Sequence, residues 1–256
     1  MTKNLILSLF PGIDGLGIGF ERHGYCVVRG PDKITGGDVR EFKAVAGFEG
    51  VIAGPPCQGF SKLNRNPDQY SHEMLDETIR VILEAAPDWF LIENVEGVPD
   101  VAVDGYITQR FVLDLAWFSD YGRKRVFQFG SVKGVVLNPM YKPRGKVKRG
   151  AVTCSESVGV EVMRDIHGFP STHALPCMHR SAKKRAYGNA VPIQLAQYVA
   201  GLIRGATGGT VAELKSKPLP GRPAKRCACG CGRELIGRQK RFSSGTCRVR
   251  GHRKGL

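Results

Sequence analysis

The sequence lacks any apolar run long enough to span a membrane, and its eight cysteines do not follow a disulfide pattern. The apolar run 5–10 stops at Pro11-Gly12 without a small-residue cleavage site, so we interpret it as a first strand and not as a signal peptide. Four cysteines crowd into the C-terminal tail, and the others are scattered at positions 26, 57, 154 and 177. This distribution favours a protein of the reducing cytoplasm.

Acidic residues are nearly missing from the tail. Residues 214–256 contain 13 Lys and Arg against one acidic residue, Glu234, whereas the first 213 residues hold 25 basic and 22 acidic groups. Most of the net charge of +15 therefore belongs to the tail. A nearly neutral body with a basic tail predicts a polyanionic partner, most simply nucleic acid. A tail that only solubilises the protein is the alternative.

The most informative stretch is residues 50–61, which lead an apolar strand into a rigid turn. Pro55 and Pro56 fix φ and remove two backbone donors, so the strand ends there and Cys57 follows at its carboxyl end. An isolated cysteine is more often a buried and inert residue. A cysteine nucleophile reacts as the thiolate and needs an open, electropositive place, which the carboxyl edge of a parallel sheet supplies.

Other strands predict functional groups at the same edge. The first strand is followed by the glycine turn 11–17 and a helix, which is the opening of a nucleotide-type α/β unit. The apolar strand that ends at Ile92 carries Glu93 at its exit, beside Cys57 if the two strands are neighbours. A helical pattern beginning at Met74 separates these two strands and ends at Pro87.

Several segments together resemble, in order, the motifs of the cytosine-C5 methyltransferases over about residues 4–203. They are Pro-Pro-Cys-Gln at 55–58, Glu-Asn-Val at 93–95, Arg-x-Arg at 123–125 and Gly-Asn-Ala-Val-Pro at 188–192. The resemblance implies an α/β fold: a Rossmann-like, mostly parallel sheet with helices on both faces. It also implies a small irregular target-recognition lobe, and the basic tail forms a small C-terminal module. We expect a catalytic domain (1–130), the lobe (131–180), a return helix (181–204), a linker (205–224) and the tail (225–256).

The resemblance also implies a reaction and its residues. The protein is expected to be a DNA cytosine-C5 methyltransferase that uses S-adenosylmethionine. Cys57 would add to C6 of a cytosine flipped out of the duplex, Glu93 would share a proton with N3, and Arg125, with Arg123 behind it, would hold O2 and the neighbouring phosphate. The expected cofactor contacts are Phe10, Gly12, Asp14, Gly15, Leu16, Asp32, Asp38, Pro56, Asn189 and Val191.

Basic segments provide the expected contacts to double-stranded DNA. The residues predicted to contact nucleic acid are Ser61, Lys142, Arg144, Lys146, Lys183, Lys184 and Arg185. In the tail, thiolate and imidazole groups with tight glycine turns predict a small zinc module. Its four ligands come from Cys227, Cys229, Cys231, Cys247 and His252. The alternative is a disordered basic tail. The protein is expected to act as a monomer away from membranes.

Three positions depart from the family pattern. Ser8 stands where the family often has Asp, Asp14 stands where a glycine is common, and either Tyr121 or a deletion replaces the usual Gln before the arginines. Residues 104–119 are expected to form a helical region.

Three other functions remain open: methylation of cytosine in tRNA, a catalytically silent DNA-binding relative, and a dinucleotide oxidoreductase that rests on the glycine turn alone.

Overall fold

The computed structural model describes residues 4–61, 69–140 and 158–208. The chain divides into two units, Met1–Val211 and Ala212–Leu256, and the second lies outside the described residues. The predicted zinc ligands therefore lie outside them too, as do Lys142, Arg144 and Lys146. The predicted domain boundaries stay predictions.

The described residues form six strands and five α-helices, with short 3₁₀ turns between some of them. The strands are β1 (Leu5–Leu9), β2 (Cys26–Arg29), β3 (Gly50–Ala53), β4 (Trp89–Asn94), β5 (Ile107–Asp114) and β6 (Lys124–Ser131). The α-helices are α1 (Gly15–Glu21), α2 (Tyr70–Ala85), α3 (Val160–Ile166), α4 (Arg180–Asn189) and α5 (Ile193–Ala206).

The strands form one six-stranded sheet in the order β2-β1-β3-β4-β6-β5. β1 pairs in parallel with β2 and β3, and β3 pairs in parallel with β4, whereas β6 runs antiparallel to both β4 and β5. Only β6 is therefore reversed, which confirms the predicted mostly parallel sheet.

The expected helical region at 104–119 is wrong, because residues 107–114 form β5 and only the short 3₁₀ turn Leu115–Trp117 follows. Phe111 and Leu113 are buried two residues apart, and this spacing is the period of a strand.

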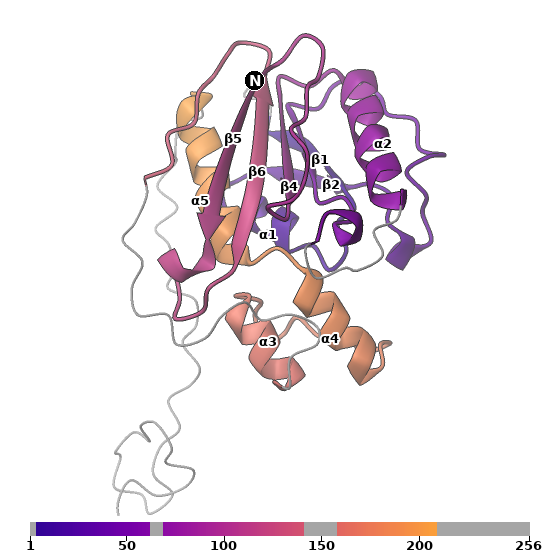
Figure 1. The fold of residues 1–256 in the computed structure, drawn as a ribbon, viewed down its shortest axis with the longest axis vertical. Coiled ribbons are helices and arrows are strands. Elements are labelled where there is room, and N and C mark those ends of the chain that lie inside the picture. The colour runs from indigo at the N-terminus through magenta and orange to yellow at the C-terminus, as the bar shows by residue number, and fades with distance from the viewer. Residues whose placement is uncertain (1–3, 62–68, 141–157, 209–256) are drawn as a thin grey trace, which may run out of the picture. The chain divides into compact units, whose positions relative to one another are not determined.

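Helices cover both faces of the sheet, as predicted. Leu16 and Phe20 of α1 pack with Leu195 and Val199 of α5 in one core cluster, and α2 packs into a separate cluster on the other face (Figure 1). α1 and α5 approach closely because α1 carries Gly19, where a Cβ would lie 2.3 Å from Ala196 Cβ.

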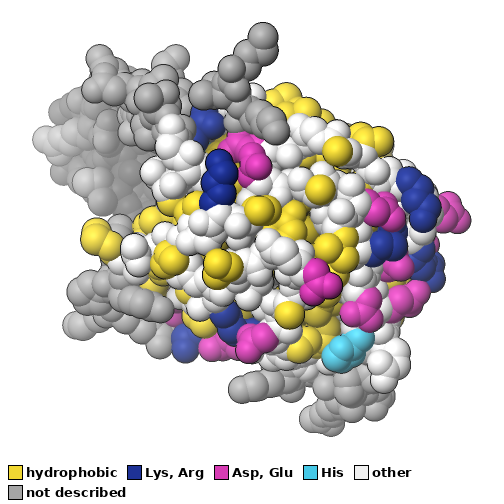
Figure 2. Space-filling view, turned by 90° about the horizontal axis from the view of Figure 1, so that it is seen from above, with side chains coloured by type: hydrophobic (Ala, Val, Ile, Leu, Met, Phe, Trp, Pro, Cys, Tyr) yellow, Lys and Arg dark blue, Asp and Glu magenta, His cyan; other side chains and the backbone are white. Residues whose placement is uncertain are grey.

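Two further helices complete the described part of the chain. α3 and α4 pack on each other below the edge of the sheet at which β5 ends and β6 begins (Figure 1). Acidic and basic side chains are intermixed over the described surface seen from above, in agreement with the nearly neutral body (Figure 2). Within residues 4–61, 69–140 and 158–208, no helix is both long and apolar enough to cross a membrane.

Candidate active site

Cys57 and Glu93 lie at the same edge of the sheet because β3 and β4 are adjacent parallel strands. β3 ends at Ala53, and the turn through the two prolines delivers Cys57 to the start of a 3₁₀ turn, Gln58–Phe60. The Asn94 side chain donates a hydrogen bond to the Pro55 carbonyl (3.1 Å) and thereby ties the end of β4 to this turn. A Cβ built on Gly54 would lie 3.8 Å from Glu93 Oε2, so the carboxyl group borders the turn.

Glu93 forms a buried ion pair with Arg125. Arg125 Nε lies 2.9 Å from Glu93 Oε1, and the two side chains are 15% and 9% exposed. Burial raises the pKa of Glu93 above its ordinary value, although Arg125 and Arg123 act in the opposite direction. A carboxyl group with a raised pKa is suited to hold a proton for a substrate nitrogen.

Cys57 is half-buried. Burial raises the pKa of its thiol, and the neighbouring Glu93 raises it further, while Arg125 and Arg123 lower it. Two arginines thus act on the thiol, as an electropositive place requires, but desolvation outweighs them.

Arg123 is buried and contacts backbone carbonyl groups. Its side chain is buried, and Nη2 donates to the Gly188 carbonyl (2.7 Å) and to the Ala190 carbonyl (3.4 Å). Asp114 Oδ1 also accepts a hydrogen bond from the Arg123 backbone N–H (2.8 Å). Arg123 thus fixes the end of α4 and the residue that follows it, and its role behind Arg125 in holding the substrate stays a prediction.

A cavity of about 580 Å³ connects the glycine turn to Glu93. This volume is within the ordinary range for a small-molecule site. The cavity wall includes nine of the ten predicted cofactor residues, namely Phe10, Gly12, Gly15, Leu16, Asp32, Asp38, Pro56, Asn189 and Val191.

Asp14 is the exception: it is not among the residues of the cavity wall, and its assignment as a cofactor contact stays a prediction. It adopts the left-handed conformation (φ 62°), which glycine adopts without strain, and it caps α1 by accepting from Gly17 N–H (3.0 Å). Arg29 Nε lies 2.6 Å from its Oδ2. Burial nevertheless raises the pKa of Asp14 to about 6, because desolvation outweighs the arginine.

Two acidic residues on the cavity wall are held by their own contacts. Asp32 accepts hydrogen bonds from Gly12 N–H (2.8 Å) and Ile34 N–H (2.7 Å), and so joins the first glycine turn to the end of β2. The Arg40 side chain donates to both carboxylate oxygens of Asp38, and these hydrogen bonds lower the pKa of Asp38 to about 2.

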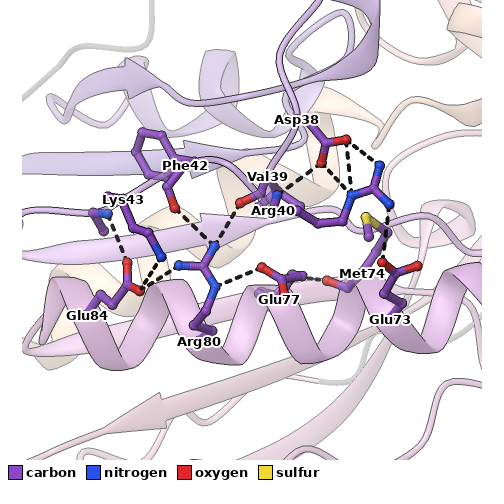
Figure 3. A network of polar contacts seen from close by, with 12 residues as sticks. Asp38, Val39, Arg40, Phe42, Lys43, Glu73, Met74, Glu77, Arg80 and Glu84 are labelled. Carbon is purple, nitrogen blue, oxygen red and sulfur yellow. Dashed lines mark hydrogen bonds and ion pairs between the residues drawn. The ribbon is translucent and has the colours of Figure 1, made fainter.

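The segment around Asp38 is fastened to α2 (Figure 3). Arg80 Nη2 donates to the carbonyls of Val39 (2.8 Å) and Phe42 (3.0 Å), while the rest of its guanidinium pairs with Glu77 and Glu84. Val39 is part of the cavity wall, so these contacts fix the wall in position before any ligand binds.

Sequence reasoning missed two groups on the cavity wall. Ser8 Oγ is buried, and no hydrogen-bond partner for it is found among the described residues. Arg185 was assigned to nucleic acid but lies on the wall, whereas Lys183 and Lys184 do not. Ser61 ends the 3₁₀ turn after Cys57. A signal for Arg185 was its place one helical turn before Asn189, because both then face the same side of α4.

Comparison with known proteins shows similarity to DNA methyltransferases. Residues 30–111 match the family model described as C-5 cytosine-specific DNA methylase. The chain is 26% identical over 228 residues to Type II methyltransferase M.XorII of Xanthomonas oryzae pv. oryzae, covering 68% of this chain and 53% of that protein. It is 28% identical over 175 residues to Type II methyltransferase M.NgoPII of Neisseria gonorrhoeae, covering 55% and 51%. The chain thus spans about half the length of the curated relatives it matches.

Solved structures agree on the fold. The Entamoeba histolytica methyltransferase EhMeth superposes with a TM-score of 0.61 at 12% identity, covering 80% of this chain and 99% of that one. The S. pombe Dnmt2 methyltransferase superposes with a TM-score of 0.57, also at 12% identity, over 80% and 99% of the two chains. The fold is therefore an α/β, Rossmann-like methyltransferase fold. The matched segment and the listed relatives make the chain similar to cytosine-C5 DNA methyltransferases.

Proposed function

We propose that the protein transfers a methyl group from S-adenosylmethionine to C5 of cytosine in DNA. The observation that carries the proposal is the meeting of a thiol, a buried carboxyl group and an arginine at one sheet edge, where Glu93 borders the same cavity as the glycine turn. The names of the similar Type II methyltransferases support the reaction class.

The cavity fits the methyl donor. Asp32 and Asp38 offer carboxylates to the ribose hydroxyls and the adenine amino group, and Ser8 Oγ offers a buried hydroxyl without a protein partner. Gly12, with φ 57°, keeps the wall free of side chain where the backbone turns. When bound, the sulfonium of the donor supplies an electrophilic methyl group.

The protein's own residues prepare the cytosine. The Cys57 thiolate adds to C6, which moves electron density toward C5 and makes that carbon nucleophilic. Glu93 holds a proton at N3 and offsets the charge that develops on the ring. Arg125 keeps Glu93 in place through the 2.9 Å contact and presents its guanidinium to O2. After C5 is methylated, loss of the C5 proton restores the double bond and expels Cys57.

The cytosine has to leave the helical stack to reach Cys57, which costs a few kcal/mol. Lys183 and Lys184 of α4 and the basic residues of the tail are the candidates to bind the phosphates. Since the tail carries much of the charge, we expect binding to weaken steeply with salt. The zinc-binding tail stays a prediction.

Replacement of Cys57 tests the proposal. Purified protein is incubated with labelled donor and either duplex DNA or tRNA, and the product is digested to locate 5-methylcytosine. We expect labelled duplex DNA with the wild type, loss of nearly all turnover with Cys57→Ser, and no loss with Cys177→Ser, which changes an exposed cysteine. Near-normal methylation by Cys57→Ser would show that Cys57 is not the nucleophile. Labelled tRNA without labelled DNA would show that DNA is not the substrate.

A further inference from the structure

This inference concerns Arg185 and rests on the proposed function. Ala182, Arg185, Ala186 and Asn189 of α4 lie on the wall of the donor cavity, and each is three or four residues from another of them. One face of α4 is thus turned toward the cavity. We infer that Arg185 binds the carboxylate of the donor's amino-acid end and selects ligands that carry this group.

The charges on the cavity wall favour this assignment. The acidic residues on the wall are held by other groups of the protein: Asp32 by backbone N–H groups, Asp38 by Arg40 and Glu93 by Arg125. Lys33, the other basic residue there, lies 4.1 Å from the Tyr70 ring centroid. Within the described ranges, Arg185 forms neither an ion pair nor a side-chain hydrogen bond and is exposed. A guanidinium that faces a cavity without a carboxylate partner is suited to a bidentate contact with one.

The arrangement of the cavity gives the same answer. If Asp32 and Asp38 receive the adenosine end and the methyl group faces Glu93, the amino-acid end meets the part of the wall formed by the glycine turn and α4. The carboxylate is the one anionic group of the donor, because its sulfonium and its amino group are cationic. Arg185 is therefore the complementary side chain.

The end of α4 is anchored, so Arg185 is presented from a fixed support. Arg123 donates a hydrogen bond to the Gly188 carbonyl (2.7 Å), and α1 packs closely against the segment that follows α4. A Cβ at Gly15 would lie 2.2 Å from the Val191 carbonyl oxygen, so only glycine permits this approach. Fixing a binding group before the ligand arrives lowers the entropic cost of binding.

Two ligands that differ in the amino-acid end test the inference. S-adenosylhomocysteine carries the carboxylate, and 5′-methylthioadenosine has the same nucleoside and sulfur without it. Binding of each to the full chain is measured by calorimetry without DNA, for wild type, Arg185→Ala and Arg180→Ala. Arg180 lies on the same helix, is exposed and is not part of the cavity wall, so it is the matched control.

We expect Arg185→Ala to weaken S-adenosylhomocysteine binding by about ten- to a hundredfold, as for loss of a hydrogen-bonded charged partner. Its affinity for 5′-methylthioadenosine should stay within about twofold of wild type, and Arg180→Ala should leave both affinities unchanged. Equal weakening of both ligands, or no weakening, overturns the inference.

The outcomes also separate this inference from the proposed function. Wild-type protein that binds neither ligand refutes the donor site itself, and with it the inference. If Arg185→Ala keeps full S-adenosylhomocysteine affinity but loses affinity for a duplex oligonucleotide, the residue contacts phosphate instead. That result overturns the inference and leaves the methyltransferase proposal standing.

Discussion

Removal of Arg125 tests whether the buried pair with Glu93 governs both stability and protonation at the site. Arg125→Met deletes the guanidinium at 2.9 Å and keeps much of the side-chain volume. The Glu93 carboxyl is then left buried without its partner. Breaking one side of a buried pair costs about 3 kcal/mol of unfolding free energy at a pH where the remaining group is charged.

The cost should depend on pH. Burial raises the pKa of Glu93, and loss of Arg125 removes an influence that lowers it, so the variant's pKa rises further. A carboxyl whose folded pKa exceeds its unfolded value contributes stability at low pH, and this contribution is lost as the pH rises above the unfolded value. We therefore expect a small cost at pH 5 and the larger cost at pH 8.

Urea unfolding followed by tryptophan fluorescence measures this effect, since Trp89 of β4 is buried beside the sheet core. Glu93→Gln combined with Arg125→Met should recover part of the lost stability, because a neutral amide replaces the unpaired carboxylate. An equal cost at pH 5 and pH 8, together with simple additivity of the two substitutions, would refute the reasoning.

Three further measurements follow from the structure. The rate of Cys57 alkylation should be low at pH 8 and keep rising beyond pH 9, because burial raises the pKa of Cys57. Peptide mass measures the alkylation, with the exposed Cys26 as internal standard. Half-maximal alkylation below pH 8 would contradict this. Wild type should lose about 3 kcal/mol of unfolding free energy between pH 4 and pH 7 through Asp14, because its folded pKa of about 6 exceeds the ordinary value of 3.8. In urea unfolding, Asp14→Asn should flatten this dependence of stability on pH. An unchanged dependence would speak against the role of Asp14. Gly19→Ala should cost about 1–3 kcal/mol of unfolding free energy, because the added Cβ would lie 2.3 Å from Ala196 Cβ. Gly205→Ala should not destabilise the protein, because the space around Gly205 is open. Equal effects of the two substitutions would show that helix packing is not the cause.

Sequence reasoning reached the strands and the edge where the site lies, because these follow from local signals. The prolines before Cys57 end β3, and Glu93 belongs to the end of β4, so parallel pairing brings them to one edge. The incorrect prediction of a helical region at 104–119 had a local cause as well. Polar and apolar residues are mixed in this short stretch, so the period of two in β5 was not recognised.

What the sequence did not yield depends on distant contacts. Arg123 and Arg125 are two residues apart and share a strand period, yet one reaches the Gly188 carbonyl and the other reaches Glu93. Their partners lie 65 and 32 residues away in the chain, so spacing alone does not assign them. The raised pKa of Cys57 likewise depends on how deeply the turn is enclosed, which is a property of the packed fold.

The reversed direction of β6 has a practical consequence for protein engineering. Ile107 pairs with Ser131 at the far edge of the sheet, while Asp114 pairs with Lys124 at the edge where Cys57 and Glu93 lie. The turn at Gly105 has φ 83° and open space where a Cβ would project, and it belongs to that far edge. A peptide tag or fluorescent label inserted there would be separated from Cys57 and Glu93 by the full length of β5, which makes this loop a natural attachment point.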